Sequence, residues 1–215
     1  MWLVVETSGT LCSTGIYAPA TKHWLAYSRI DQADHSSILP SMINEVFDIS
    51  GVGRKEISAL ATNLGPGSFT GLRIGLAFLK GFHAVFKPTF LTTTTFKMLF
   101  YALPTEKQRG TVHTVIPMHR KKVYLQTFKD RRELDPIVLT IDEAIKLFEN
   151  TKGLIVASQK TDWIQNLTEF SVEIYNVEAS LITKVPELDV IDTSEVMFIE
   201  PRYVAEFVPH SGKQG

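Results

Sequence analysis

Cysteine is almost absent from this sequence, in which Cys12 is the only one. A lone cysteine closes no internal disulfide and supplies no metal cluster by itself, which is typical of a protein in a reducing compartment. Long apolar runs are lacking too: none approaches the length of a membrane span, and residues 1–5 are too short for a signal-peptide core and have no basic leader. We therefore expect a cytoplasmic protein that binds no membrane.

An excess of charge of either sign is also missing, because 22 Lys and Arg stand against 23 Asp and Glu. Non-specific binding of nucleic acid depends on clustered Lys and Arg, so the balanced charge argues against a grip on nucleic acid by the chain as a whole, and if RNA is involved we expect a partner to hold most of it. The local exception is the basic segment 119–122, with Lys129, Arg131 and Arg132 nearby. This segment is either a solvated turn or an RNA contact.

Histidine pairs with metal-ligand spacing are absent as well. A His-x-x-x-His pair on a helix presents two imidazoles on one face, but the residue four positions after His35 is Leu39. Ser68 lies in Pro-Gly-Ser-Phe-Thr, not in a Gly-x-Ser-x-Gly elbow, and Cys12 lies in an expected strand with no base beside it. The sequence therefore predicts no metal site and no catalytic nucleophile.

The composition, 44% hydrophobic over 215 residues, suits one large or two small globular domains. A continuous apolar run of strand formers, followed by two strands that are entered through turns, predicts a three-stranded antiparallel meander at the N-terminus, after which the period becomes helical. The elements expected in the first part of the chain are strands 2–5, 12–17 and 24–29, a helix from Ser36 to Gly51, strand 57–62, helix 70–86, strand 89–92 and helix 96–103. This order indicates an α/β layer.

The apolar periodicity lapses between residues 103 and 110, and we place a domain boundary there. The N-terminal domain is then 1–103, and a smaller α/β domain covers 110–209. The second domain is expected to contain the strand pair 112–116 and 122–128, helix 141–148, strand 154–157, and a last helix at 193–199 that packs back on the first domain.

A glycine-rich loop between strand 57–62 and helix 70–86 is the most specific feature of the sequence. Gly65 and Gly67 permit positive φ and close approach, Pro66 stiffens the turn, and Ser68 or Thr70 can cap the helix. The loop is not a Walker A motif, because Thr70 occupies the position of its second glycine. Two interpretations stay open: the loop binds a phosphate, or its glycines allow a helix to pack tightly.

Five segments resemble the TsaB family, also called YeaZ, in the actin-like ATPase and sugar-kinase superfamily, and they occur in the family's order. They are 3–8 (Leu-Val-Val-Glu-Thr-Ser), 35–40 (His-Ser-Ser-Ile-Leu-Pro), 65–75 (the glycine loop), 120–124 (Arg-Lys-Lys-Val-Tyr) and 200–203 (Glu-Pro-Arg-Tyr). The resemblance implies a two-domain actin-like ATPase fold with mixed sheets flanked by helices. The chain departs from the family at Glu6, where Asp is usual, at 118–120 and at 204–205.

The resemblance also implies a function. TsaB-like proteins are non-catalytic scaffolds and activators of a TsaD-like transferase, with a TsaE-like ATPase as third member, and they form homodimers when TsaD is absent. The complex places threonylcarbamoyl on the adenosine 3′ of the anticodon, in tRNAs that read codons beginning with A, so tRNA would be met only through the complex. No cofactor is required, although a degenerate cleft can bind a nucleotide weakly. Its wall would be Glu6, Thr7, Ser8, Gly65, Pro66 and Gly67.

The helix 70–86 is apolar on every side, so it has to be covered on more than one side. Either the C-terminal domain covers the excess or a partner does, and we expect a partner because helix 36–50 offers a second apolar face. The expected partner surface consists of Ile38, Leu39, Met42, Ile43, Val46, Leu72, Ile74, Gly75 and Phe78.

Two other functions compete with this interpretation. A stand-alone ATPase or small-molecule kinase of the same superfamily would use the cleft, with Glu6 near a bound metal. A metallopeptidase is the second alternative, and the missing second histidine after His35 speaks against it.

Overall fold

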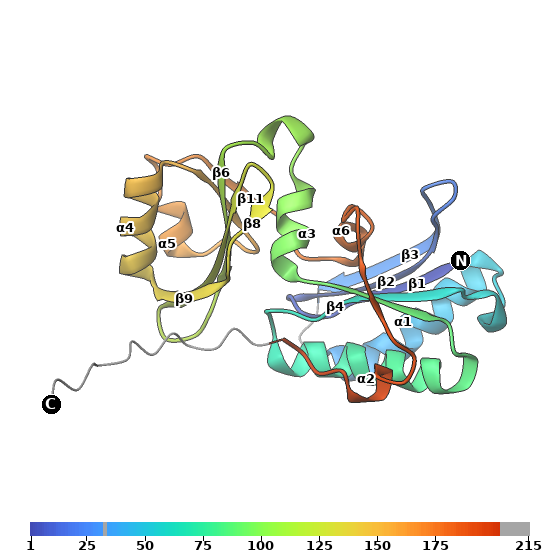
Figure 1. Cartoon of the computed structure of the whole chain (residues 1–215). Helices are drawn as coiled ribbons and strands as arrows, with labels where there is room; N and C mark the ends of the chain where they lie inside the picture. Colours follow the sequence, from blue (N-terminus) through green and yellow to red (C-terminus); the bar gives the residue numbers. More distant parts are fainter. Residues whose placement is uncertain (32–33, 203–215) are drawn as a thin grey trace, which may run out of the picture.

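The structure is a computed structural model that describes residues 1–31 and 34–202, so Tyr203 and the remainder of the expected second domain lie outside the described residues. The described residues form two six-stranded sheets, each at the centre of one lobe. Figure 1 shows the two lobes side by side, with one helix, α3, between them.

The first sheet has the strand order β12-β5-β4-β1-β2-β3. Its strands are β1 (Trp2–Glu6), β2 (Leu11–Ala18), β3 (His23–Asp31), β4 (Ala59–Asn63), β5 (Thr89–Thr93) and β12 (Asp189–Ile191). The first three pair antiparallel, which confirms the predicted meander, while β4 and β5 run parallel to β1. The parallel strands are reached through helical crossovers, as a parallel pair requires.

Helices cover both faces of this sheet (Figure 1). On one face lie α1 (His35–Ser50) and α2 (Phe69–Phe86), and on the other lie α3 (Thr95–Ala102) and α6 (Ala179–Ile182). A short 3-10 helix, η1 (Arg54–Glu56), leads from α1 to β4. The side chains of Asp34 and Ser68 accept the N–H groups of Ser37 and Gly71, which caps α1 and α2, and Ser68 is one of the two caps that the sequence predicted for α2.

The second sheet has the order β11-β10-β6-β7-β8, with β9 paired to β7. Its strands are β6 (Thr111–Pro117), β7 (Lys122–Lys129), β8 (Arg132–Glu133), β9 (Ile137–Thr140), β10 (Leu154–Ala157) and β11 (Val172–Ile174). The helices α4 (Ile141–Thr151) and α5 (Asp162–Gln165) pack on the face away from α3, around Phe148 and Ile155. A 3-10 helix, η2 (Thr105–Lys107), joins α3 to β6.

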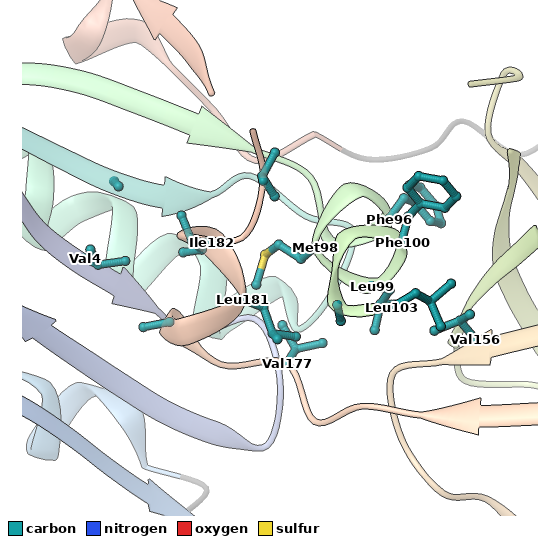
Figure 2. Close-up of a cluster of buried hydrophobic side chains, with 14 of the residues drawn as sticks. Val4, Phe96, Met98, Leu99, Phe100, Leu103, Val156, Val177, Leu181 and Ile182 are labelled. Carbon is teal, nitrogen blue, oxygen red and sulfur yellow. The ribbon is translucent and has the colours of Figure 1, made fainter. Parts of the chain in front are cut away.

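The helix α3 joins the two lobes because its side chains are buried on both sides (Figure 2). Met98 and Leu99 belong to the same buried cluster as Val4 of the first sheet and Val156 of the second. Phe100 stacks on Phe128, with ring centroids 4.2 Å apart. The boundary at 103–110 stays a prediction, since this core is continuous from one sheet to the other.

After β11 the chain returns to the first sheet. Strand β12 pairs with β5, and the 3-10 helix η3 (Val196–Phe198) packs against α2. Lys80 of α2 donates to the carbonyl oxygens of Met197 and Ile199 at 3.0 and 2.5 Å. Of the helix expected at 193–199, only Val196–Phe198 are helical, so this segment, which was assigned to the second domain, lies with the first sheet.

Candidate functional site

The start of α2 packs directly on the turn that follows β1, and glycines make this possible. A Cβ on Gly71 would lie 1.9 Å from the carbonyl oxygen of Thr7, and one on Gly67 would lie 2.7 Å from Ser8. Two hydrogen bonds join the same backbones: Thr7 Oγ1 donates to the Gly71 carbonyl at 2.8 Å, and the Ser68 N–H donates to the Ser8 carbonyl at 2.7 Å. These contacts support the interpretation in which the glycines of the loop allow α2 to pack tightly.

The backbone N–H groups at the start of α2 that a bound phosphate would need as donors already make hydrogen bonds within the protein. The Ser68 N–H is bound to Ser8, and the Gly71 N–H is bound to the Ser68 hydroxyl at 3.2 Å. Gly65 takes φ = 106°, which confirms the predicted positive φ at this glycine, whereas Gly67 does not take a positive φ.

Asn63, at the end of β4, holds the loop in place, and the sequence analysis missed it. Its amide nitrogen donates to Ser8 Oγ at 3.0 Å and to Thr95 Oγ1 at 2.7 Å, while its oxygen accepts the Gly65 N–H at 2.7 Å. Thr95 in turn donates to the Pro66 carbonyl at 2.6 Å. The sequence feature that could have identified Asn63 is its position, as a single polar residue at the end of a buried strand and directly before the glycine loop.

Glu6 is buried and has an exposed fraction of 0%. Its Oε1 accepts the Ser8 N–H at 2.5 Å, and its Oε2 has no hydrogen-bond partner among the described residues. Burial raises the pKa of the Glu6 carboxyl above its usual range, although hydrogen bonds from Ser8 act in the opposite direction. Burial also raises the pKa of the neighbouring Cys12 thiol to about 11, so this thiol stays protonated at neutral pH.

A cleft of about 960 Å³ lies where the two lobes meet at the start of α2. One wall contains Ser8, Pro66, Gly67 and the first turn of α2, and the facing wall contains part of the β6–β7 turn. Of the basic segment predicted from the sequence, His119, Arg120 and Lys122 line this cleft.

The six residues expected to form the cleft wall therefore divide into two groups. Ser8, Pro66 and Gly67 line the cleft, whereas Glu6, Thr7 and Gly65 lie behind it. The described part of the chain contains no group of three or more His, Cys, Asp or Glu side chains that could hold a metal ion.

Most of the expected partner surface is buried inside the first lobe, which corrects that prediction. Leu39, Met42, Ile43, Val46, Leu72 and Gly75 are buried. The first four belong to the core cluster between the first sheet and the helices packed on it, and Leu72 lies next to Gly65 of the glycine loop. Periodicity alone does not distinguish a core-facing stripe from a partner-facing one, because both are apolar. Only Ile38, Ile74 and Phe78 remain half-buried.

The side of α2 that faces away from the sheet is nevertheless apolar. Six residues at spacings of three or four lie on it, and we call them the outer stripe of α2: Ile74, Ala77, Phe78, Gly81, Ala84 and Val85. Val85 is 70% exposed, and a Cβ on Gly81 would meet no atom within 4 Å. Next to α2, the η3 residues Met197 and Phe198 are also exposed.

The two-sheet architecture and the cleft define the class: this is an actin-like α/β protein. Solved structures agree over nearly the whole chain. YeaZ from Pseudomonas aeruginosa superposes with a TM-score of 0.73 at 17% identity, covering 94% of this chain and 99% of that one. An inorganic polyphosphate/ATP-glucomannokinase from Arthrobacter reaches a TM-score of 0.50 at 11% identity, covering 92% of this chain and 98% of that one. These likenesses show the fold.

Sequence comparison then identifies the family. Residues 29–172 match the family model described as TsaD, tRNA N6-adenosine threonylcarbamoyltransferase. The tRNA threonylcarbamoyladenosine biosynthesis protein TsaB of Escherichia coli K12 is 32% identical over 79 residues, and that of Haemophilus influenzae is 34% identical over 79 residues. The chain belongs to this TsaD-related family, as one of its TsaB (YeaZ) members.

The sequence match to these relatives is partial, because it covers 37% of this chain and 33% of each of the two TsaB proteins. Within residues 1–31 and 34–202, no helix combines the length and the apolar character needed to cross a bilayer.

Proposed function

We propose that this chain is a supporting subunit of the machinery that forms N6-threonylcarbamoyladenosine in tRNA, and that it acts by binding a TsaD-like transferase. Membership of the TsaB family supports the pathway. The observation that carries the mode of action is the outer stripe of α2, an exposed apolar side on a helix whose opposite side is already packed on a sheet.

The chemistry of the outer stripe favours a helical partner. Ala77, Gly81 and Ala84 have little or no side chain, so a second helix can approach the α2 backbone closely between the larger Ile74, Phe78 and Val85. Exposed apolar area of this kind is typical of an interaction site. In the absence of the transferase we expect two copies of this chain to pair through the same stripe, and we propose that a TsaE-like ATPase joins the complex elsewhere.

The position of Glu6 supports a non-catalytic role. A kinase or ATPase of this fold would need its first-strand carboxylate in the cleft to orient a metal-bound nucleotide. Here the carboxylate lies behind Ser8, outside the cleft lining, where burial favours its neutral form. We propose that the chain requires no cofactor and that tRNA is held mainly by the complex.

Co-expression with the TsaD-like transferase of the same cell tests this proposal. Val85→Asp places a charge on the outer stripe, and Val190→Asp places the same charge at an equally exposed valine of β12, since the two are 70% and 69% exposed. Both changes leave the buried core intact. We expect the transferase to co-purify with the original chain and with Val190→Asp, and to be lost with Val85→Asp.

A control separates lost binding from lost folding. At a protein concentration at which both chains are monomers, circular dichroism and the urea midpoint of the isolated Val85→Asp chain should match those of the original, because exposed substitutions usually change stability by less than about 0.5 kcal/mol. Co-purification that survives Val85→Asp would rule out the outer stripe as the contact. A buried residue such as Met42 is unsuitable for this test, since a charge there would unfold the lobe.

A further inference from the structure

A second hollow, of about 950 Å³, lies at the C-terminal end of α3, distinct from the cleft at the start of α2. Its wall comes mainly from segments that lie far apart in the sequence. They are the start of β1 with the β2–β3 turn, the end of α3 with η2, the β7–β8 turn, and the loop that follows α6. Nothing in the proposed function makes use of this hollow.

Aromatic rings form part of its wall. Trp2 and Tyr17 line it with ring centroids 5.9 Å apart, and Tyr101 lines it from α3. The row continues beyond the hollow, because Tyr17 contacts Trp24 with centroids 5.1 Å apart. Tyr17 is buried and the other two lining rings are half-buried, so each is fixed in place and still presents a surface. Fixed, partly open rings are the kind of platform on which nucleobases stack.

The charges that line the hollow are all positive. Lys22, Arg131 and Lys184 come from three different segments, and all three side chains are exposed. Among the described residues that line it there is no carboxylate. The Arg131 guanidinium lies 5.8 Å from the centroid of the Tyr101 ring, which places a cation at the edge of the aromatic surface. Such an arrangement attracts an anion next to a flat ring.

Gln108 supplies a third feature. Its side chain lines the hollow and is only 5% exposed. The amide nitrogen donates to the Leu103 carbonyl at 2.8 Å, and since a carbonyl can only accept, this bond fixes which end of the amide is the oxygen. The Oε1 atom has no partner within residues 1–31 and 34–202. A buried acceptor without a donor is unfavourable, so an N–H that reaches it is bound with preference.

We propose that this hollow binds a nucleotide unit. The base stacks against the rings of Trp2 and Tyr101 and directs an N–H toward Gln108 Oε1, while the phosphate lies among Lys22, Arg131 and Lys184. The three features together select a flat, N–H-bearing ring that carries negative charge. The unit belongs either to a free mononucleotide or to an unpaired position of an RNA strand, and the chemistry of the contact is the same for both.

Isothermal titration of the full chain with four probes tests the proposal: 5′-AMP, adenosine, ribose 5-phosphate and hexa-adenylate RNA. We expect AMP, hexa-adenylate or both to bind. Adenosine lacks the phosphate and ribose 5-phosphate lacks the base, so we expect the affinity of each to be lower by a factor of about ten or more. Binding of AMP identifies the free nucleotide as the ligand, whereas binding of hexa-adenylate alone identifies RNA.

Matched variants locate the ligand. Arg131→Gln removes a cation of the hollow, and Arg132→Gln removes the exposed neighbouring cation, which does not line it. We expect Arg131→Gln to weaken binding about fivefold or more and Arg132→Gln to leave it within about twofold. Tyr101→Ala should weaken nucleotide binding about tenfold, and the urea midpoint of this variant shows whether the chain is still folded. Failure of AMP and hexa-adenylate to bind at millimolar concentration, or equal binding by Arg131→Gln and the original chain, would overturn the proposal.

Discussion

Replacing Gly71 by alanine tests the packing between the glycine loop and the turn after β1. The new Cβ would lie 1.9 Å from the Thr7 carbonyl oxygen, a backbone atom that cannot rotate away. Real Cβ contacts are not shorter than 3.0 Å, so α2 or the turn has to move by about 1 Å. A shift of this size also breaks the hydrogen bond from Thr7 Oγ1 to the Gly71 carbonyl.

The expected free energy follows from three contributions. Overpacking costs about 1–3 kcal/mol, and the lost hydrogen bond costs about 0.5–1.5 kcal/mol. Alanine is the better helix former and offsets about 1 kcal/mol. Gly71→Ala should therefore lower the free energy of unfolding by about 2 kcal/mol, which is a large part of the roughly 5–15 kcal/mol that holds an ordinary domain together.

Gly81→Ala on the same helix is the matched control. Its Cβ would meet no atom of its own chain within 4 Å, so in the monomer only the helix propensity changes, and we expect a gain of about 0.5–1 kcal/mol at a protein concentration too low for pairing through the outer stripe. Urea unfolding followed by circular dichroism should show the midpoint falling by about 1 M for Gly71→Ala and rising for Gly81→Ala. If both variants were as stable as the original chain or more so, the close-packing account of the loop would be refuted.

Two further predictions concern buried side chains. Burial and the charge of Lys129 lower the pKa of His113 to about 4 from its ordinary value of 6.5. Between these pH values only the unfolded chain is protonated at His113, so the free energy of unfolding should fall as the pH drops from 6.5 to 4, by at most about 3 kcal/mol. His113→Gln should make the free energy of unfolding depend less on pH, as measured by urea unfolding at several pH values. Leu39→Ala should cost about 2–4 kcal/mol because Leu39 is buried against the sheet, whereas Ile49→Ala, at a residue 63% exposed on the same helix, should cost under about 0.5 kcal/mol in the same assay.

The first lobe followed from the sequence because its signals are local. The apolar strand formers and turns of β1 to β3, the cap at Ser68 and the left-handed Gly51 after α1 each act over a few residues. The return of the chain at β12 was not predicted. Three residues paired with β5 from about a hundred positions away carry no local pattern, and only the completed sheet edge stabilises them.

The functional surfaces were harder to predict for a physical reason. Apolar spacing on α1 and α2 showed that both helices are covered but not by what, and the structure assigns Leu39, Met42 and Val46 to the sheet. The outer stripe became visible only after these side chains had been assigned. The hollow at the end of α3 depends on several separate segments, so spacing along the chain could not reveal it.

The central claim is that the chain acts by binding a transferase and performs no chemistry of its own. Its most direct test is the amount of N6-threonylcarbamoyladenosine formed in tRNA, measured by mass spectrometry, when the purified TsaD-like transferase, the TsaE-like ATPase and the threonylcarbamoyl donor are incubated with the original chain, Val85→Asp or Val190→Asp. We predict that the original chain and Val190→Asp raise product formation, that Val85→Asp does not, and that the chain without the transferase forms none. Product made by the chain alone, or equal stimulation by Val85→Asp and Val190→Asp, would contradict the account.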